Sequence, residues 1–252
     1  MLSLEGVPHF SRNGVTLYNG CAIALLARLR GVADLVVTDP PYRLTSGGKN
    51  AQVMSGIFAS DRYDNSGELM RMVEWTDFSR PLLEACKPNA DAYVMANDKQ
   101  IFPAHAAMIG AGWRCHNLLV WNKGAPTRNR WYMKENEYTL YLWKGRARTI
   151  SNPGSKQTFA ASRPNRAEKI HDTQKPVELL EHYIRNSSEP GDLVLDPFAG
   201  SAATLVAALL SGRRAIGIEI DVDNFRAAVA RLESICEKKT YIPTEGENVR
   251  RR

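Results

Sequence analysis

The sequence predicts an α/β fold built on a doubly wound, mostly parallel sheet. Short apolar runs rich in β-branched residues, such as Ala33–Val37 and Asp192–Asp196, have the length and composition of buried parallel strands. Segments with apolar residues at helical spacing lie between them, and strands that alternate with helices form a sheet covered on both faces. The expected strands Asn117–Trp121 and Tyr138–Trp143 follow one another without a helix, which indicates an antiparallel edge.

Length and charge are consistent with one basic domain. The chain has 252 residues, enough for one large α/β domain with insertions but a tight fit for two. Lys and Arg total 33 against 27 Asp and Glu, and this net charge of +6 permits a polyanionic partner without requiring one. The four cysteines form no C-x-x-C pair, so we expect neither a metal site nor disulfides. Because no leader and no apolar run of roughly 18 residues occurs, we expect a soluble, cytoplasmic protein with no membrane partner.

The other elements follow the same alternating order. We expect a single domain over residues 1–236, opening with an arm over residues 1–15, and a disordered tail over residues 237–252. The remaining expected elements are a strand and turn at Thr16–Cys21, helices at Ala22–Arg30 and Leu69–Cys86, a strand at Ala90–Ala96, a helix at Ile101–Gly110, a helix at Ala202–Leu210, a strand at Arg214–Asp221 and a helix at Asn224–Cys236.

The stretch Thr38-Asp39-Pro40-Pro41-Tyr42 is the first candidate for a functional site. Two prolines forbid the preceding strand from continuing, so a carboxylate, a rigid corner and an aromatic ring follow the strand's carboxyl end. Ligands of open α/β sheets bind at that edge, which favours a role in binding or catalysis. The alternative is an ordinary turn with a packed tyrosine.

A second stretch ends in an acid in the same way. The strand at Asp192–Asp196 passes through Pro197-Phe198-Ala199-Gly200-Ser201 into a helix of small residues. With both stretches present, the chain resembles the amino-methyltransferases that act on DNA, which pair a DPPY-type catalytic motif with an FxGxG-type motif for S-adenosylmethionine. The catalytic motif comes first here, as in the beta class, and the resemblance covers roughly Thr16 to Ile235. The sequence departs from the pattern at Ala202, where the family has the last glycine of FxGxG.

The resemblance implies a Rossmann-like methyltransferase fold and assigns the site residues. It makes Asp39, Pro40, Pro41 and Tyr42 catalytic. The expected cofactor contacts are Asn19, Cys21, Thr173, Lys175, Asp196, Phe198, Ala199, Gly200, Ser201 and Glu219.

Five of these cofactor contacts lie in three segments that have their own sequence context. The family's Gly-Asp turn reads Gly20-Cys21 here, so a contact there must come from the backbone or from Asn19, and an ordinary turn is the alternative. The segment Thr173-Gln174-Lys175-Pro176 resembles the family's TQKP element, although Pro176 also suits a plain helix start. Glu219 ends a strand about 20 residues beyond the glycine turn, where an acid can accept hydrogen bonds from ribose hydroxyls.

Three segments are candidates for contact with DNA. The Gly- and Ser-rich loop over residues 43–66 follows the catalytic motif, and residues 124–136 and 145–172 combine cations with aromatic or small residues. Because the family places target recognition between its two motifs, we expect a small target-recognition insertion there, the alternative being solvated, mobile loops. The expected contacts are Arg43, Lys49, Arg128, Arg130, Trp131, Arg146, Arg148, Lys156, Arg163 and Arg166.

These features predict a methyltransferase that modifies the N6 amine of a flipped-out adenine in double-stranded DNA. Cytosine-N4 transfer uses the same amine chemistry, but family members with that activity usually carry Ser in place of Asp39. An RNA or protein amine is less favoured. A catalytically idle DNA-binding relative is the alternative from another class, because Cys21 and Ala202 depart from the family pattern. A homodimer is expected from the resemblance alone.

Overall fold

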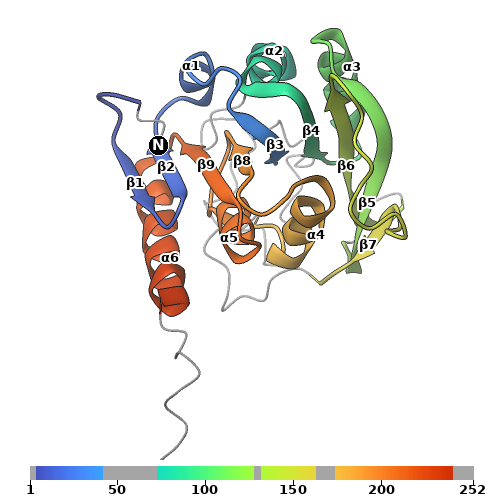
Figure 1. The fold of residues 1–252 in the computed structure, drawn as a ribbon. Coiled ribbons are helices and arrows are strands. Elements are labelled where there is room, and N and C mark those ends of the chain that lie inside the picture. The colour runs from blue at the N-terminus through green and yellow to red at the C-terminus, as the bar shows by residue number, and fades with distance from the viewer. Residues whose placement is uncertain (1–3, 42–72, 128–131, 163–173, 241–252) are drawn as a thin grey trace, which may run out of the picture.

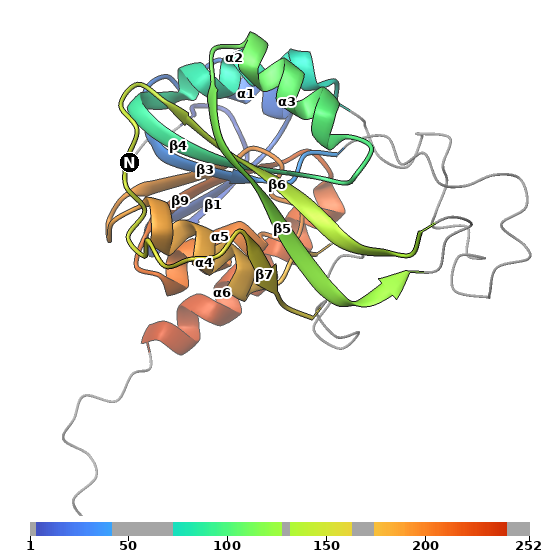
Figure 2. The same cartoon turned by 90° about the vertical axis from the view of Figure 1, so that its right-hand side faces the viewer.

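The computed structural model describes residues 4–41, 73–127, 132–162 and 174–240. Within these ranges the chain forms one mixed sheet in the order β1-β2-β9-β8-β3-β4-β6-β5-β7, covered by helices on both faces (Figures 1 and 2). The strands are β1 (His9–Arg12), β2 (Val15–Asn19), β3 (Ala33–Thr38), β4 (Cys86–Ala96), β5 (Arg114–Thr127), β6 (Lys134–Lys144), β7 (Thr158–Ala160), β8 (Leu193–Asp196) and β9 (Arg214–Glu219). The helices are α1 (Ala22–Leu26), α2 (Trp75–Ala85), α3 (Ile101–Gly110), α4 (Val177–Ser187), α5 (Ala203–Leu210) and α6 (Val222–Thr240).

The five central strands, β2, β9, β8, β3 and β4, are parallel, as predicted. Strands β3 and β8 lie side by side, with Leu35 opposite Val194 and Val36 opposite Leu195. From β3 the chain passes through α2 to β4 on one side, and from β8 it passes through α5 to β9 on the other. The strand order therefore reverses between β3 and β8, which is where doubly wound sheets bind their ligands.

Each face of the sheet carries its own hydrophobic core. Helices α1, α2 and α3 cover one face and α4, α5 and α6 the other, as Figures 1 and 2 show from two sides. Along β3, Val36 joins the first core and Leu35 and Val37 join the second. Because successive side chains of a strand point to opposite faces, burial of both faces requires the continuous apolar run seen in the sequence.

The structure corrects the sequence-based elements at the two edges of the sheet. The predicted N-terminal arm contains β1, which pairs antiparallel with β2. Segment 145–172, predicted as a loop, contains β7, which pairs parallel with β5. Both strands are short, so neither has enough residues to show a period in the sequence.

Several other elements are longer than predicted, and among them β4 begins at Cys86 instead of Ala90. Strands β5 and β6 form a long twisted hairpin, clearest in Figure 2, that includes part of segment 124–136. Helix α6 continues to Thr240, into the stretch predicted as a disordered tail. Most of the added residues at the tip of the hairpin and at the end of α6 are polar, so hydrophobic periodicity does not reveal them.

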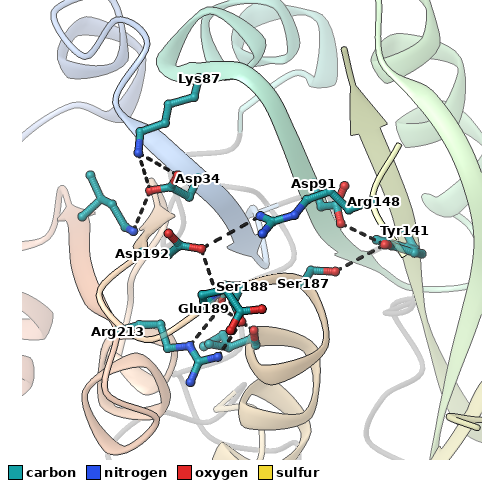
Figure 3. A network of polar contacts seen from close by, with 12 residues as sticks. Asp34, Lys87, Asp91, Tyr141, Arg148, Ser187, Ser188, Glu189, Asp192 and Arg213 are labelled. Carbon is teal, nitrogen blue, oxygen red and sulfur yellow. Dashed lines mark hydrogen bonds and ion pairs between the residues drawn. The ribbon is translucent and has the colours of Figure 1, made fainter. Parts of the chain in front are cut away.

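A polar network joins the amino ends of the central strands (Figure 3). Asp34 accepts hydrogen bonds from the Lys87 ammonium at 2.7 Å and from the Leu193 backbone N–H at 2.9 Å, which ties β3 to β4 and β8. The hydroxyl of Tyr141 on β6 donates to the carboxylate of Asp91 on β4 at 2.9 Å. These contacts leave the opposite, carboxyl edge of the strands as the place for a ligand. No helix in the described part of the chain is long and apolar enough to cross a membrane.

Candidate active site

The carboxyl ends of β3 and β8 bring the two predicted acids together. The hydroxyl of Thr38, the last residue of β3, donates to Asp196 Oδ1 at 2.8 Å, and Asp39 follows directly. The Asp39 side chain is about one-fifth exposed, at 22%. The end of β3 thus links the two carboxyl groups, although 158 residues separate Thr38 from Asp196.

Asp196 is held in a fully buried, polar position. Burial raises the pKa of its carboxyl to about 6, the hydrogen bonds from Thr204, Thr38 and the Phe198 backbone oppose that rise, and the charge of Asp39 adds to it. The Phe198 N–H donates to Asp196 Oδ1 at 3.1 Å, so the carboxylate also shapes the turn that follows it.

That turn allows a close approach of the backbone. Gly200 has φ +48°, and a Cβ built there would meet nothing within 4 Å. Ala202, where the family has glycine, also adopts the left-handed conformation, with φ 58° and ψ 28°. The departure is therefore accommodated by a strained alanine that keeps the glycine backbone.

Helix α5 packs tightly against β9 behind this turn. A Cβ on Gly217 would come within 2.8 Å of Leu205 and 3.0 Å of the Ala199 Cβ. Phe198 packs edge-on against Phe78 of α2, with ring centroids 5.0 Å apart. The backbone carbonyl of Ser201 accepts from Arg231 of α6 at 2.9 Å. Gly200 is thus the member of the turn with open space beside it, while Phe198, Ala199 and Ser201 also fix the turn in place.

Glu219 closes the other side of the turn. Its Oε2 accepts from the Gly200 N–H at 2.8 Å and its Oε1 from the Asp221 N–H at 2.8 Å. Asn19, at the end of β2, donates its amide hydrogen to the Glu219 carbonyl at 2.9 Å and so joins β2 to β9. Cys21 is exposed and caps α1 without a side-chain hydrogen bond.

Lys175 lies beside the catalytic candidate. Its ammonium is 2.5 Å from Asp39 Oδ2 and 3.0 Å from Glu137 Oε2, and Glu137 Oε1 is 3.2 Å from the Lys123 ammonium. The order of side chains is therefore Lys123, Glu137, Lys175, Asp39. Burial favours a higher pKa for Glu137, but the ammonium groups of Lys175 and Lys123 outweigh it and lower that pKa to about 2.

Sequence reasoning missed both Glu137 and Lys123. They lie on neighbouring strands, β6 and β5, and their pairing across the hairpin brings them together. No local signal in the sequence marks them, because the burial of Lys123, which is only 6% exposed, follows from the pairing of the strands. Lysine is almost never fully buried without a partner.

Several predicted site residues lie outside the described residues. These are Tyr42, Thr173 and the DNA-contact candidates Arg43, Lys49, Arg128, Arg130, Trp131, Arg163 and Arg166. The predicted loop over residues 43–66 lies outside them as well.

The described basic candidates do not gather at the site. The Arg148 guanidinium lies 3.9 Å from the Asp192 carboxylate, at the amino end of β8 (Figure 3). The Arg146 backbone N–H donates to the Asn89 side chain near the start of β4. Lys156 is exposed and lies two residues before β7 in the sequence. The geometry therefore does not support Arg146 and Arg148 as neighbours of Asp39.

Comparison with known proteins shows the family of this chain. A family model described as DNA methylase, of the N6/N4 methyltransferase type, matches residues 33–230, which include both acid motifs. The chain belongs to this DNA methylase family. It is 29% identical over 250 residues to the Type II methyltransferase M2.DpnII of Streptococcus pneumoniae, covering 90% of this chain and 92% of the relative.

Solved structures share the fold. The M1.HpyAVI-SAM complex superposes with a TM-score of 0.67 at 21% identity, over 86% of this chain and 98% of the other. The PvuII DNA methyltransferase, described as cytosine-N4-specific, gives 0.64 at 18% identity, over 89% of this chain and 92% of the other. This DNA methylase therefore has the Rossmann-like methyltransferase fold that its sequence predicts.

Membership in the family makes S-adenosylmethionine the cofactor, and the residues present fit it. Open space beside Gly200 leaves room for a group to approach the backbone of the turn. Glu219 places a carboxylate at the end of the neighbouring strand, where ribose hydroxyls are bound in such sheets.

Proposed function

We propose that this DNA methylase is a site-specific methyltransferase that modifies the exocyclic N6 amine of adenine in double-stranded DNA. The observation that carries the proposal is the position of Asp39. It follows β3 directly, and the neighbouring strand β8 leads into the glycine turn. A carboxylate for the amine and a turn for the cofactor therefore face the same point of strand reversal.

The chemistry at that point requires help from hydrogen-bond acceptors. S-adenosylmethionine would supply an electrophilic methyl group: as the new N–C bond forms, the sulfonium C–S bond breaks to leave neutral S-adenosylhomocysteine, and the amine gives up one proton, which passes to solvent. The adenine amine is a poor nucleophile because its lone pair is delocalised into the ring. The Asp39 carboxylate and the Pro40 carbonyl accept the two amine hydrogens, which localises the lone pair and stabilises the positive charge that develops on nitrogen. Pro41 keeps this corner rigid, since its ring fixes φ.

The cofactor is held by the turn between β8 and α5 and by the strands beside it. In this proposal Glu219 accepts from the ribose hydroxyls, the backbone of Phe198, Ala199, Gly200 and Ser201 faces the methionine end, and Asp196 orders that turn. Asn19 and Cys21 border the adenosine end through the β2 turn, and Thr173 stays a predicted contact. Lys175 forms an ion pair with Asp39, so its positive charge acts on the catalytic acid as well as on the cofactor.

The target base has to leave the duplex, because its amine lies inside the stacked helix. Tyr42, next after Pro41, is proposed to stack on the flipped base. Phosphate contacts from Arg43, Lys49, Arg128, Arg130, Arg163 and Arg166 are proposed to offset the cost of flipping, which is a few kcal/mol. Trp131 adds a stacking ring in the same segment.

Cytosine-N4 transfer is the second candidate. The fold that this chain shares with a cytosine-N4-specific enzyme supports it, since exocyclic amines of both bases need the same acceptors. Asp39 favours adenine, because family members that act on cytosine usually carry Ser at this position. A homodimer stays a prediction from the resemblance.

The decisive experiment combines product analysis with one substitution. Mass spectrometry of digested DNA after incubation with the protein and S-adenosylmethionine is expected to show N6-methyladenine. Asp39→Ala is expected to reduce transfer by about two or more orders of magnitude while cofactor affinity by calorimetry stays near the wild-type value, because the lost acceptor acts on charge that develops in the transition state.

Asp98→Ala is the matched control, since Asp98 follows β4 at the same edge and pairs with Lys134 in an exposed ion pair. It is expected to keep transfer close to the wild-type rate. N4-methylcytosine in the digest would show that the substrate base is cytosine and not adenine. Full activity of Asp39→Ala would show that Asp39 has no part in the mechanism.

A further inference from the structure

Glu137 is the one group in the described site that touches two cations at once. Its two carboxylate oxygens contact two different ammonium groups, Lys175 at 3.0 Å and Lys123 at 3.2 Å. The side chains are largely enclosed, with exposures of 25% for Glu137, 10% for Lys175 and 6% for Lys123. Neither Glu137 nor Lys123 belongs to the motifs that define the site in the sequence.

Stability alone does not explain this arrangement. Enclosed ions lose their hydration, and replacing a buried ion network by apolar residues is often neutral or stabilising. Strand β6 lies between β4 and β5, and Glu137 stands on it just before the buried stretch Thr139 to Leu142. A carboxylate held at the carboxyl edge of the sheet between two lysines therefore points to the chemistry at that edge.

We propose that Glu137, supported by Lys123, is a positioning residue for methyl transfer: it holds Lys175 beside Asp39 and balances its charge. This inference rests on the proposed function, because it concerns how Asp39 receives the amine. Glu137 touches neither substrate nor cofactor in this scheme and acts through Lys175.

The first part of the argument concerns hydrogen bonds. Lys175 contacts Asp39 Oδ2, the kind of oxygen that the incoming amine must use. When the amine arrives, Lys175 has to yield part of that contact, and Glu137 Oε2 gives its ammonium a second acceptor at 3.0 Å. The ammonium can then turn from one carboxylate to the other without being left unpaired in an enclosed site, which would be costly.

The second part concerns charge. The two ammonium groups and the two carboxylates of Lys123, Glu137, Lys175 and Asp39 sum to zero. Without Glu137 the sum is +1, next to a nitrogen that becomes positive as the methyl group arrives. An uncompensated cation there opposes the developing charge, and the effect is larger in an enclosed site than in water.

The test compares Glu137→Gln with the double variant Lys123→Met/Glu137→Gln. The single variant keeps the shape but leaves one surplus positive charge, so kcat is expected to fall about tenfold or more. The double variant restores the summed charge to zero, and its kcat is expected to be at least about threefold higher than that of the single variant. Glu181→Gln is the control, because Glu181 has a matching exposure of 26% and an ion pair with Arg185 on α4; its kcat is expected to stay within about twofold of wild type.

Two readouts that do not depend on turnover separate positioning from damage to the fold. Cofactor affinity of Glu137→Gln, by calorimetry, is expected to stay within about threefold of wild type. Affinity for a target duplex without cofactor, by fluorescence anisotropy, is expected to be unchanged or tighter, since the surplus charge attracts phosphate.

Two outcomes would overturn the inference. One is a Glu137→Gln enzyme with wild-type kcat. The other is a single variant that loses cofactor and DNA affinity together with kcat, and that the second substitution does not improve. Asp39→Ala in the same assay keeps the proposals apart: if it is inactive while Glu137→Gln is fully active, this inference fails and the proposed function stands.

Discussion

At the scale of single residues, the site is built from carboxylates placed where they are poorly solvated. Asp196 is buried and next to Asp39, so its pKa is raised to about 6, first by burial and then by that neighbouring charge. Glu137 is also enclosed, yet two ammonium groups lower its pKa to about 2. Two acids in one site thus have opposite shifts because one has hydroxyl and backbone partners and the other has cations.

The Asp196 shift predicts a pH dependence of stability. A folded pKa near 6 against an ordinary value of 3.8 means that the folded state binds the extra proton between about pH 4 and pH 6. Stability therefore falls as pH rises through that window, and the full penalty applies above it. Relative to Asp196→Asn, the wild type is expected to lose about 2 kcal/mol between pH 4 and pH 7, from 1.36 kcal/mol per pKa unit and an unfolded carboxyl that is already partly ionised at pH 4.

Urea unfolding of both proteins at several pH values measures this difference. The asparagine oxygen can still accept from Thr38 and Phe198, so the variant is a close isostere. Parallel stability curves for the two proteins would contradict the assignment of a raised pKa to Asp196.

At the scale of elements, the turn between β8 and α5 keeps a left-handed backbone conformation at Ala202, although the usual glycine is replaced by alanine. Ala202 stands at the N-cap of α5 with φ 58° and is fully buried. An alanine in the left-handed region costs roughly 1 kcal/mol more than glycine. Burial of the methyl group offsets about 0.8 kcal/mol of that cost. The motif therefore keeps its geometry with little net loss of stability.

Substitutions at Ala202 test this balance. Ala202→Gly is expected to change the free energy of unfolding by less than about 1 kcal/mol, because relief of strain is offset by lost burial and a more flexible unfolded chain. Ala202→Val is expected to destabilise by about 2 kcal/mol or more, since a branched side chain combines strain at positive φ with overpacking. Denaturant unfolding gives both values, and a valine variant as stable as the glycine variant would contradict the left-handed conformation.

At the scale of the whole molecule, the sheet has two chemically different edges. The carboxyl edge carries Asp39, Asp196 and Glu219, and the amino edge carries the network of Asp34, Lys87, Asp192 and Arg148. At the second edge, Lys87 pairs with Asp34 and Arg148 with Asp192, as Figure 3 shows. We therefore expect DNA contact to depend on the edge at which a cation lies more than on net charge.

Salt dependence of DNA binding tests this distinction. Neutralising Arg163 and Arg166 together is expected to reduce the slope of log affinity against log salt by up to roughly two units, if each contacts a phosphate. Arg146→Gln/Arg148→Gln is the matched control at the amino edge and is expected to leave the slope unchanged. A lower slope for the control pair would mean that DNA also contacts the amino edge.

The sequence alone was enough to predict the elements whose signals are local. The apolar run of β3, the prolines that end it, the acid and small residues after β8, and the helical stripes of α2 and α5 all lie within short windows, where periodicity and turn chemistry operate. Order along the chain then implied a sheet that reverses between β3 and β8. For the same reason the sequence identified Asp39 and Asp196 as facing one site.

The tertiary structure decided what depends on pairing between distant segments. Lys175 reaches Asp39 across 136 residues, and Glu137 meets Lys123 only because β5 and β6 pair with a shifted register. The short strands β1 and β7 form because neighbouring strands offer them hydrogen-bond partners, not because their residues show a period. Local pattern sets which segments become strands and helices, whereas ion pairs and edge strands arise from contacts that no short window of sequence contains.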